Sequence, residues 1–130
     1  MKIASIDHVV LTVADMDRTI DFYTRVLGMR LETFGEGRKA LAFGAQKLNL
    51  QDGKSKADVV AVARVPTPGS VDLCFLAGQP LDEVMAELAA QGVPIEIGPV
   101  RRTGARFPIR SVYVRDPDGN LIEIAEPWQD

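Results

Sequence analysis

Residues 6–13 read IDHVVLTV, and residues 70–77 read SVDLCFLA. Both stretches alternate in the way that a half-buried strand does, and they lie 64 residues apart. His8 in the first stretch and Asp72 in the second occupy the same place in the pattern. The chain therefore reads as two copies of one unit, and each copy carries a polar residue at one position of its first strand.

The composition indicates one compact, soluble domain that spans residues 1–130. The chain is 46% hydrophobic and 25% charged, and its formal net charge is -3. This charge favours neither nucleic acid nor a membrane surface, and there is no signal-peptide pattern and no apolar run of about 18 residues. Cys74 is the single cysteine, so no internal disulfide is possible. We expect a cytoplasmic protein, with Cys74 as a small residue of the core.

The first module spans about 4–52. Residues 4–13 predict a strand, and apolar residues at helical spacing then run from Met16 to Leu27, with Asp15 or Asp17 as the N-cap. Gly28 suits the end of that helix. Three strands are expected next, over residues 30–34, 38–44 and 46–52, which gives the order β-α-β-β-β.

The second module, about 70–126, repeats this order after a linker over 53–69. A strand over 70–77 is followed by a helix that begins near Pro80 and ends at Gly92, which lies 64 residues after Gly28. The strands expected next are 93–98, 109–115 and 120–126. DPDGN, residues 116–120, predicts a tight turn between the last two. The fold class is therefore α+β, with two tandem βαβββ modules.

His8, Asp72 and Glu123 are the candidate metal ligands. Each lies in an alternating or apolar strand, where a charged inward side chain is costly unless it is paired or bound to a metal. Imidazole and carboxylates are good ligands for Mn²⁺, Fe²⁺, Ni²⁺ or Zn²⁺, and an oxygen-rich set also suits Mg²⁺. The alternatives are a hydrogen-bonded strand histidine, an exposed Asp72, and a Glu123 that pairs with Arg110 or Arg115.

A fourth ligand can come from the first module. Leu48-Asn49-Leu50 matches Ile122-Glu123-Ile124, so Asn49 stands where the second module has Glu123. Gln51 shares the face of Asn49. Either amide is a candidate fourth ligand or a substrate contact, and the alternative is a half-exposed polar strand residue.

A cluster of arginines with no intervening acid precedes the last turn: Arg101, Arg102, Arg106, Arg110 and Arg115. Such a cluster is usually a solvated surface, and the other interpretation is an anion site. Arg102, Thr103 and Arg115 are the candidate substrate contacts, and we expect Thr103 in a loop. Tyr113 is a candidate catalytic residue beside Glu123, because its hydroxyl can donate a proton or a hydrogen bond. Its alternative is a core tyrosine with a bonded hydroxyl.

The motifs DHVVLTV, FYTRVLGM and DPDGNLIEI resemble the vicinal-oxygen-chelate superfamily, the group of glyoxalases, bleomycin-resistance proteins and extradiol dioxygenases. GPVRRTGARFPIRSVYVRDPDGNLIEI is similar to the subgroup of glyoxalase-domain-containing protein 5 and bacterial virulence-type relatives. The resemblance implies paired βαβββ modules that form a cup-shaped mixed sheet around a divalent metal ion. It places His8 and Glu123 at the first and last metal-ligand positions.

The resemblance also implies a choice of reactions. Asn49 replaces the Glu of members with glyoxalase I activity, and Asp72 stands where a second His is common. A metal-dependent lyase or isomerase that acts on a small oxygenated, anionic substrate is the favoured function. The alternatives are a metal-free drug-binding protein, a fosfomycin-type resistance enzyme and an extradiol dioxygenase. We also expect a homodimer, because two-module chains of this size commonly pair.

Overall fold

The computed structural model describes residues 1–54 and 62–130, so part of the expected linker, 55–61, lies outside the described residues. The chain divides into two compact units, Met1–Ser70 and Val71–Asp130, and each is described here by itself. The first unit consists of β1 (His8–Val13), α1 (Met16–Asp21), a π-helical turn η1 (Phe22–Val26), β2 (Arg30–Phe34), β3 (Arg38–Phe43) and β4 (Gln46–Asp52).

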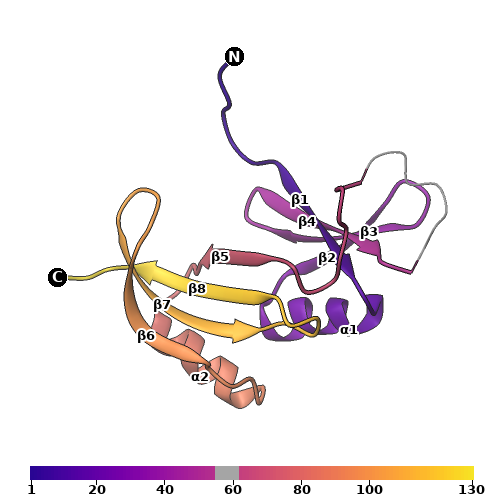
Figure 1. Cartoon of the computed structure of the whole chain (residues 1–130). Coiled ribbons are helices and arrows are strands. Elements are labelled where there is room, and N and C mark those ends of the chain that lie inside the picture. The colour runs from indigo at the N-terminus through magenta and orange to yellow at the C-terminus, as the bar shows by residue number, and fades with distance from the viewer. Residues whose placement is uncertain (55–61) are drawn as a thin grey trace. The chain divides into compact units, whose positions relative to one another are not determined.

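The first unit is a four-stranded mixed sheet with one helical segment beside it (Figure 1). The strand order is β1-β4-β3-β2, in which β1 and β4 run parallel and the other neighbours are antiparallel. Leu11 and Val13 of β1, Leu41 of β3 and Leu48 of β4 are buried and share one face of the sheet. This face holds the apolar core, which leaves the opposite face, with His8 and Asn49, to carry polar residues.

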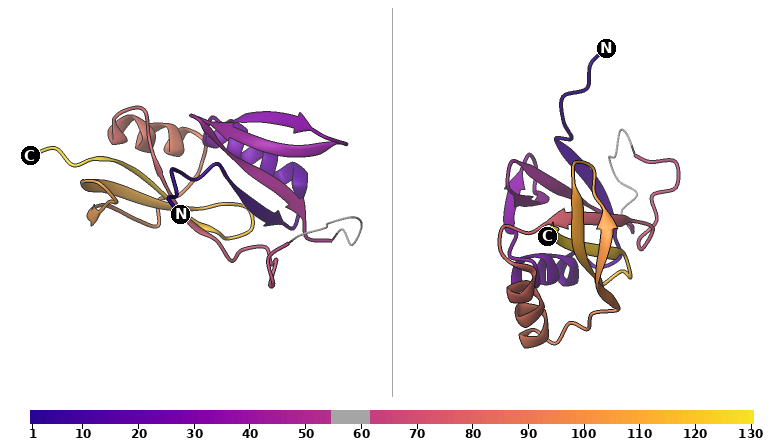
Figure 2. Two further views of the ribbon diagram at one scale, coloured as in Figure 1. Left: turned by 90° about the horizontal axis from the view of Figure 1, so that it is seen from above. Right: turned by 90° about the vertical axis from the view of Figure 1, so that its left-hand side faces the viewer.

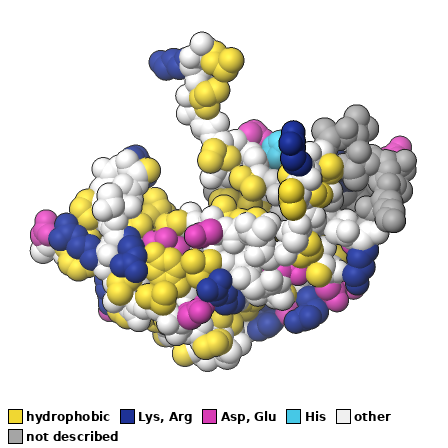
Figure 3. Space-filling view, in the orientation of Figure 1, with side chains coloured by type: hydrophobic (Ala, Val, Ile, Leu, Met, Phe, Trp, Pro, Cys, Tyr) yellow, Lys and Arg dark blue, Asp and Glu magenta, His cyan; other side chains and the backbone are white. Residues whose placement is uncertain are grey.

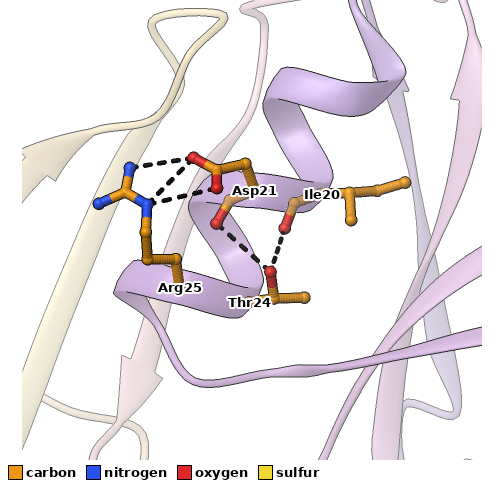
Figure 4. A network of polar contacts seen from close by, with 4 residues as sticks. All are labelled: Ile20, Asp21, Thr24 and Arg25. Atoms are coloured by element: carbon orange, nitrogen blue, oxygen red, sulfur yellow. Dashed lines mark hydrogen bonds and ion pairs between the residues drawn. The ribbon is translucent and has the colours of Figure 1, made fainter.

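Local hydrogen bonds define the helical segment of this unit. The Asp15 carboxylate accepts a bond from the Arg18 backbone N–H at 3.0 Å, which makes Asp15 the N-cap. Figure 4 shows that Arg25 donates to the Asp21 carboxylate one turn earlier, at 3.0–3.3 Å, in the arrangement of an i,i+4 ion pair. Thr24 donates to the Ile20 carbonyl oxygen at 2.7 Å. Such a back-bond widens the helix locally, in keeping with the π-helical turn at this point.

The second unit repeats the topology of the first. It consists of β5 (Asp72–Leu76), α2 (Leu81–Ala90), β6 (Ile97–Thr103), β7 (Pro108–Arg115) and β8 (Leu121–Pro127). The strand order β5-β8-β7-β6, with β5 and β8 parallel, matches β1-β4-β3-β2 position by position. The three views agree that α2 lies along one side of this sheet (Figures 1 and 2). The expected pair of βαβββ modules with mixed sheets is therefore confirmed.

Contacts from β8 and β7 fix the start of α2. Pro80 has no side chain that can cap the helix, and the Glu126 carboxylate of β8 instead accepts a bond from the Leu81 N–H at 2.7 Å. Arg110 of β7 donates to Asp82 of α2 at 3.1 Å and to Glu126 at 3.2 Å. Leu81 is fully buried against the sheet. These charges lie on the helix side of the sheet, opposite the face that carries Glu123, and the Glu123 side is here called the open face.

The DPDGN turn forms as expected and is tied to β5. The buried Asp116 carboxylate accepts from the backbone N–H groups of Asp118 and Asn120, both at 2.9 Å, and from the Asn120 side chain at 2.8 Å. The side-chain oxygen of Asn120, Oδ1, in turn accepts from the Val71 N–H at 2.8 Å. One fully buried side chain therefore joins the β7–β8 turn to the residue that precedes β5.

Two predicted strands differ from the structure. The strand expected over 4–13 begins only at His8, because residues 1–7 have no strand partner among the described residues. The strand expected over 93–98 runs instead over Ile97–Thr103, so Thr103 ends a strand and does not lie in a loop. The Glu96 backbone N–H donates to the Tyr113 carbonyl oxygen. The register of β6 against β7 then shifts between Ile97 and Val100. Such a bulge carries no local apolar signal in the sequence.

No helix among residues 1–54 and 62–130 combines the length and apolar character that crossing a membrane requires.

Candidate metal and substrate site

Glu123 lies at the centre of the open face of the second sheet. Its strand, β8, runs between β5 and β7, where Cys74 and Tyr113 are the residues directly opposite it. Asp72 lies two residues before Cys74 and is therefore on the same face. The structure thus brings together Asp72, Glu123 and Tyr113, three of the residues that the sequence predicted for the site.

The Glu123 carboxylate is held by a neutral donor. The Ser111 hydroxyl of β7 donates to one carboxylate oxygen, Oε2, at 2.6 Å, and Ser111 is fully buried. Neither Arg110 nor Arg115 pairs with Glu123: Arg110 bonds Asp82 and Glu126 on the helix side, and Arg115 bonds Glu96 at 2.6 Å. Among the described residues Glu123 therefore has no paired cation. The sequence analysis gave Ser111 no role, although its position two residues before Tyr113 already placed it on this face.

Tyr113 is nearly buried, with 8% of its surface exposed, and its hydroxyl oxygen accepts a hydrogen bond from the Arg102 Nε at 3.1 Å. Arg102 also lies over the Tyr113 ring, 5.5 Å from its centroid. Burial raises the pKa of Tyr113 above its usual value, and Arg102 opposes that change only in part. Tyr113 is therefore protonated at neutral pH and is able to donate.

A pocket of about 390 Å³ opens on this face, between β5 and the β6–β7 hairpin. In Figure 3, hydrophobic and acidic side chains lie side by side over the second unit, beside the basic side chains of the hairpin. Three charged side chains belong to its wall: the carboxylate of Glu123 and the guanidinium groups of Arg102 and Arg106. Its lining residues are Cys74, Leu76, Arg102, Thr103, Gly104, Ala105, Arg106, Phe107, Ile109 and Glu123.

Cys74 lies in this pocket as a free, exposed thiol, so its predicted place in the core was wrong. The side chains of β5 alternate, and Leu73 and Phe75 face the helix side while Cys74 faces the open side with Asp72. Desolvation first, and the neighbouring Glu123 carboxylate second, raise the pKa of the Cys74 thiol to about 11. The thiol is therefore neutral at physiological pH.

In the first unit, His8 begins β1 and its side chain is 42% exposed. Its Nδ1 lies 2.9 Å from an Asp7 carboxylate oxygen. Asn49 of β4 lies opposite Val10, just as Glu123 lies opposite Cys74, so the two are equivalent in the repeat. Asn49 is only 4% exposed, and its side-chain oxygen has no hydrogen-bond partner among the described residues.

The predicted metal ligands are divided between the units, with His8 in the first and Asp72 and Glu123 in the second. No group of three or more His, Cys, Asp or Glu side chains that could hold a metal ion occurs within the described part of the chain. The donor chemistry of the individual residues still fits a hard divalent ion. Glu123 presents a carboxylate without a paired cation, and Asn49 presents a buried oxygen without a donor.

These features define a class of protein. A profile of the Glyoxalase/Bleomycin resistance protein/Dioxygenase superfamily matches residues 5–124, and the chain belongs to this superfamily. The resemblance drawn from the sequence motifs is thereby confirmed.

The relatives include proteins of similar length. The chain is 52% identical over 126 residues to Virulence protein STM3117 of Salmonella typhimurium, over 97% of this chain and 86% of that protein. The crystal structure of STM3117 matches with a TM-score of 0.95 and 51% identity, over 98% of this chain and 100% of that one. Glyoxalase domain-containing protein RDO1 of Mycosarcoma maydis is 52% identical over 131 residues, which cover 100% of this chain and 72% of RDO1. Lactoylglutathione lyase of Haemophilus influenzae is 33% identical over 129 residues, which cover 92% and 90% of the two chains.

Proposed function

We propose that the protein is a metal-dependent lyase or isomerase that acts on a small oxygenated, anionic substrate. The observation that carries this proposal is the arrangement in the second unit, where Glu123 is oriented by Ser111 and shares a pocket with Arg102. A carboxylate without a paired cation suits a metal ion or a mobile proton, and a guanidinium suits an anionic group. The similarity to a lactoylglutathione lyase supports the reaction class.

In this proposal His8, Asp72 and Glu123 hold a divalent ion, and Asn49 or Gln51 supplies a further oxygen. The ion would be Mn²⁺, Fe²⁺, Ni²⁺, Zn²⁺ or Mg²⁺. When bound, such an ion polarises a substrate oxygen and stabilises negative charge that develops on it.

The chain's own residues would do the remaining work. Ser111 donates to Oε2 of Glu123 and orients this carboxylate, which would take a proton or bind the ion. Tyr113 is protonated and able to donate a hydrogen bond to a substrate oxygen. Arg102 and Thr103 border the pocket and would orient the anionic group. Arg115 is paired with Glu96, so its predicted role in substrate binding requires that this ion pair opens.

Asn49 separates this activity from that of glyoxalase I. A neutral amide at this position offers no carboxylate to accept a proton from carbon. We therefore propose that Glu123 is the base in this chain. Asn49→Glu is expected to increase turnover of a hemithioacetal substrate, with Asn49→Gln as the control, because it has a similar size and stays neutral.

The test is the metal content of the purified protein, measured by inductively coupled plasma mass spectrometry. One ion per chain is expected in the wild type and in Glu87→Ala, which removes an exposed carboxylate of α2. His8→Ala and Glu123→Ala are expected to lose the ion while keeping the wild-type circular dichroism spectrum. Absence of an ion from the wild type after reconstitution would contradict the proposal and would favour a metal-free binding protein.

We also propose a cytoplasmic homodimer. Light scattering coupled to size-exclusion chromatography would test the dimer, for which twice the chain mass of 14.2 kDa is expected.

A further inference from the structure

The pocket of the second unit has a fixed cationic end. Nε of Arg102 donates to the Tyr113 hydroxyl at 3.1 Å, and Nη1 donates to the Arg101 carbonyl oxygen at 3.1 Å. Both acceptors are neutral, so they orient the guanidinium without cancelling its charge. A guanidinium carries five N–H donors in a planar fork, and it binds carboxylates with two donors at once.

Arg102 and Arg106 of the cluster line the pocket, and of these two Arg102 donates to the Tyr113 hydroxyl. Arg110 and Arg115 pair with acids, Arg101 lies over the Trp128 ring at 5.0 Å, and Arg106 lies over the Phe107 ring at 5.0 Å. Within the described part of the chain, no acid forms an ion pair with Arg102. Arg102 lines the same pocket as Glu123, but these two side chains do not form an ion pair with each other. Arg102 and Glu123 therefore contribute a cation and a carboxylate to one pocket.

Part of the pocket lining is apolar. Leu76 of β5 is 50% exposed, and Phe107 and Ile109 line the same pocket. Cys74 adds its thiol to this lining. A volume of about 390 Å³ is at the small end of the range for organic ligands, so it suits a compact molecule with a short hydrocarbon portion.

We propose that this pocket selects an amphiphilic carboxylate, with the carboxylate on Arg102 and an unbranched apolar tail along Leu76, Phe107 and Ile109. The reaction that such a substrate would undergo rests on the proposed function. Binding of the substrate by this pocket does not require the metal ion. The oxygenated carbon next to the carboxylate then points toward Glu123 and Tyr113. Acids with no tail, and neutral molecules with the same tail, fit only one of the two subsites.

The experiment is isothermal titration calorimetry on chelator-treated protein with butanoate, hexanoate and octanoate, and with hexanamide as the neutral isostere of hexanoate. Burial of one methylene is expected to tighten binding about three- to fourfold, so hexanoate should bind about tenfold tighter than butanoate. Hexanamide should bind at least about tenfold more weakly than hexanoate, because it cannot form the charge-assisted fork with Arg102.

Two adjacent arginines supply the matched variants. Arg102 lies opposite Ile109 on the open face, whereas Arg101 lies opposite Arg110 on the helix face. Arg102→Gln is expected to lose hexanoate binding at least about tenfold, and Arg101→Gln is expected to keep it within about twofold. Leu76→Ser should weaken binding of hexanoate and octanoate more than binding of butanoate, and so reduce the dependence on chain length. Circular dichroism confirms that each variant is folded.

Equal binding of hexanoate and hexanamide, an equal loss in both arginine variants, or no binding of any carboxylate would overturn the inference. Because the titrations are made without metal, these outcomes are distinct from a failure of the proposed function. A protein that holds one metal ion per chain but binds no carboxylate would refute the substrate class alone. A protein that binds hexanoate through Arg102 but takes up no metal would refute the proposed function alone.

Discussion

Replacement of Asn120 by alanine should destabilise the protein far more than the same replacement of Asn49. Both asparagines are buried, at 0% and 4% exposure, and both lie in or beside the last strand of a module. Asn120 donates to the Asp116 carboxylate and accepts from the Val71 N–H, each at 2.8 Å. The side-chain oxygen of Asn49 has no partner among the described residues.

The magnitude follows from these contacts. The bond to a charged carboxylate contributes about 1.5–3 kcal/mol, and the neutral bond to Val71 contributes about 1 kcal/mol. Asn120→Ala should therefore lower the free energy of unfolding by about 2.5–4 kcal/mol, which is a large share of the total for a small domain. Asn49→Ala loses a similar volume but leaves no bonded partner behind, so we expect a loss of less than about 1 kcal/mol.

The assay is equilibrium unfolding in urea, followed by far-ultraviolet circular dichroism and by the fluorescence of Trp128, the single tryptophan. The slope of the free energy against urea should be the same in both variants, because the surface exposed on unfolding does not change. Equal losses in Asn120→Ala and Asn49→Ala would refute the reasoning. Lost volume, and not the two hydrogen bonds of Asn120, would then determine the stability.

Three further outcomes follow from single contacts. The pKa of Cys74 is raised to about 11 from 9.0, so its thiol should react with iodoacetamide at pH 8 about a hundredfold more slowly than a free thiol. The rate should rise with pH until about pH 11, and a plateau below pH 9 would contradict this. Glu126→Ala removes the acceptor of the Leu81 N–H and should lower the free energy of urea unfolding by about 1–2 kcal/mol, whereas an unchanged midpoint would show that water replaces it. Gly104→Ala would place a Cβ 2.5 Å from the Phe107 carbonyl oxygen, so calorimetry should show a melting temperature lower by about 4 °C or more. An equal or higher melting temperature would mean that the β6–β7 hairpin relaxes without cost.

The order of the elements could be predicted from the sequence because it depends on local signals. Alternation marks the strands, and Gly28 and Gly92, both at φ +70°, end the helical segments where an L side chain would be strained. The DPDGN turn is equally local, since Asp116 bonds groups only two and four residues ahead. These signals also placed Glu123 and Tyr113 on one face of a sheet.

The partners of the charged and polar residues were decided only by the tertiary structure. The arginines between 101 and 115 look alike in the sequence, yet Arg110 bonds the start of α2, Arg115 bonds Glu96, and Arg102 lines the pocket. Strand register decides which of these side chains meet, because a shift of one residue moves each of them to the other face. The sequence by itself therefore determined the repeat, the fold and the candidate carboxylates. The tertiary structure assigned Ser111 to Glu123, paired Arg102 with no acid among residues 1–54 and 62–130, and exposed Cys74. Each of these depends on contacts between strands that are distant in the chain.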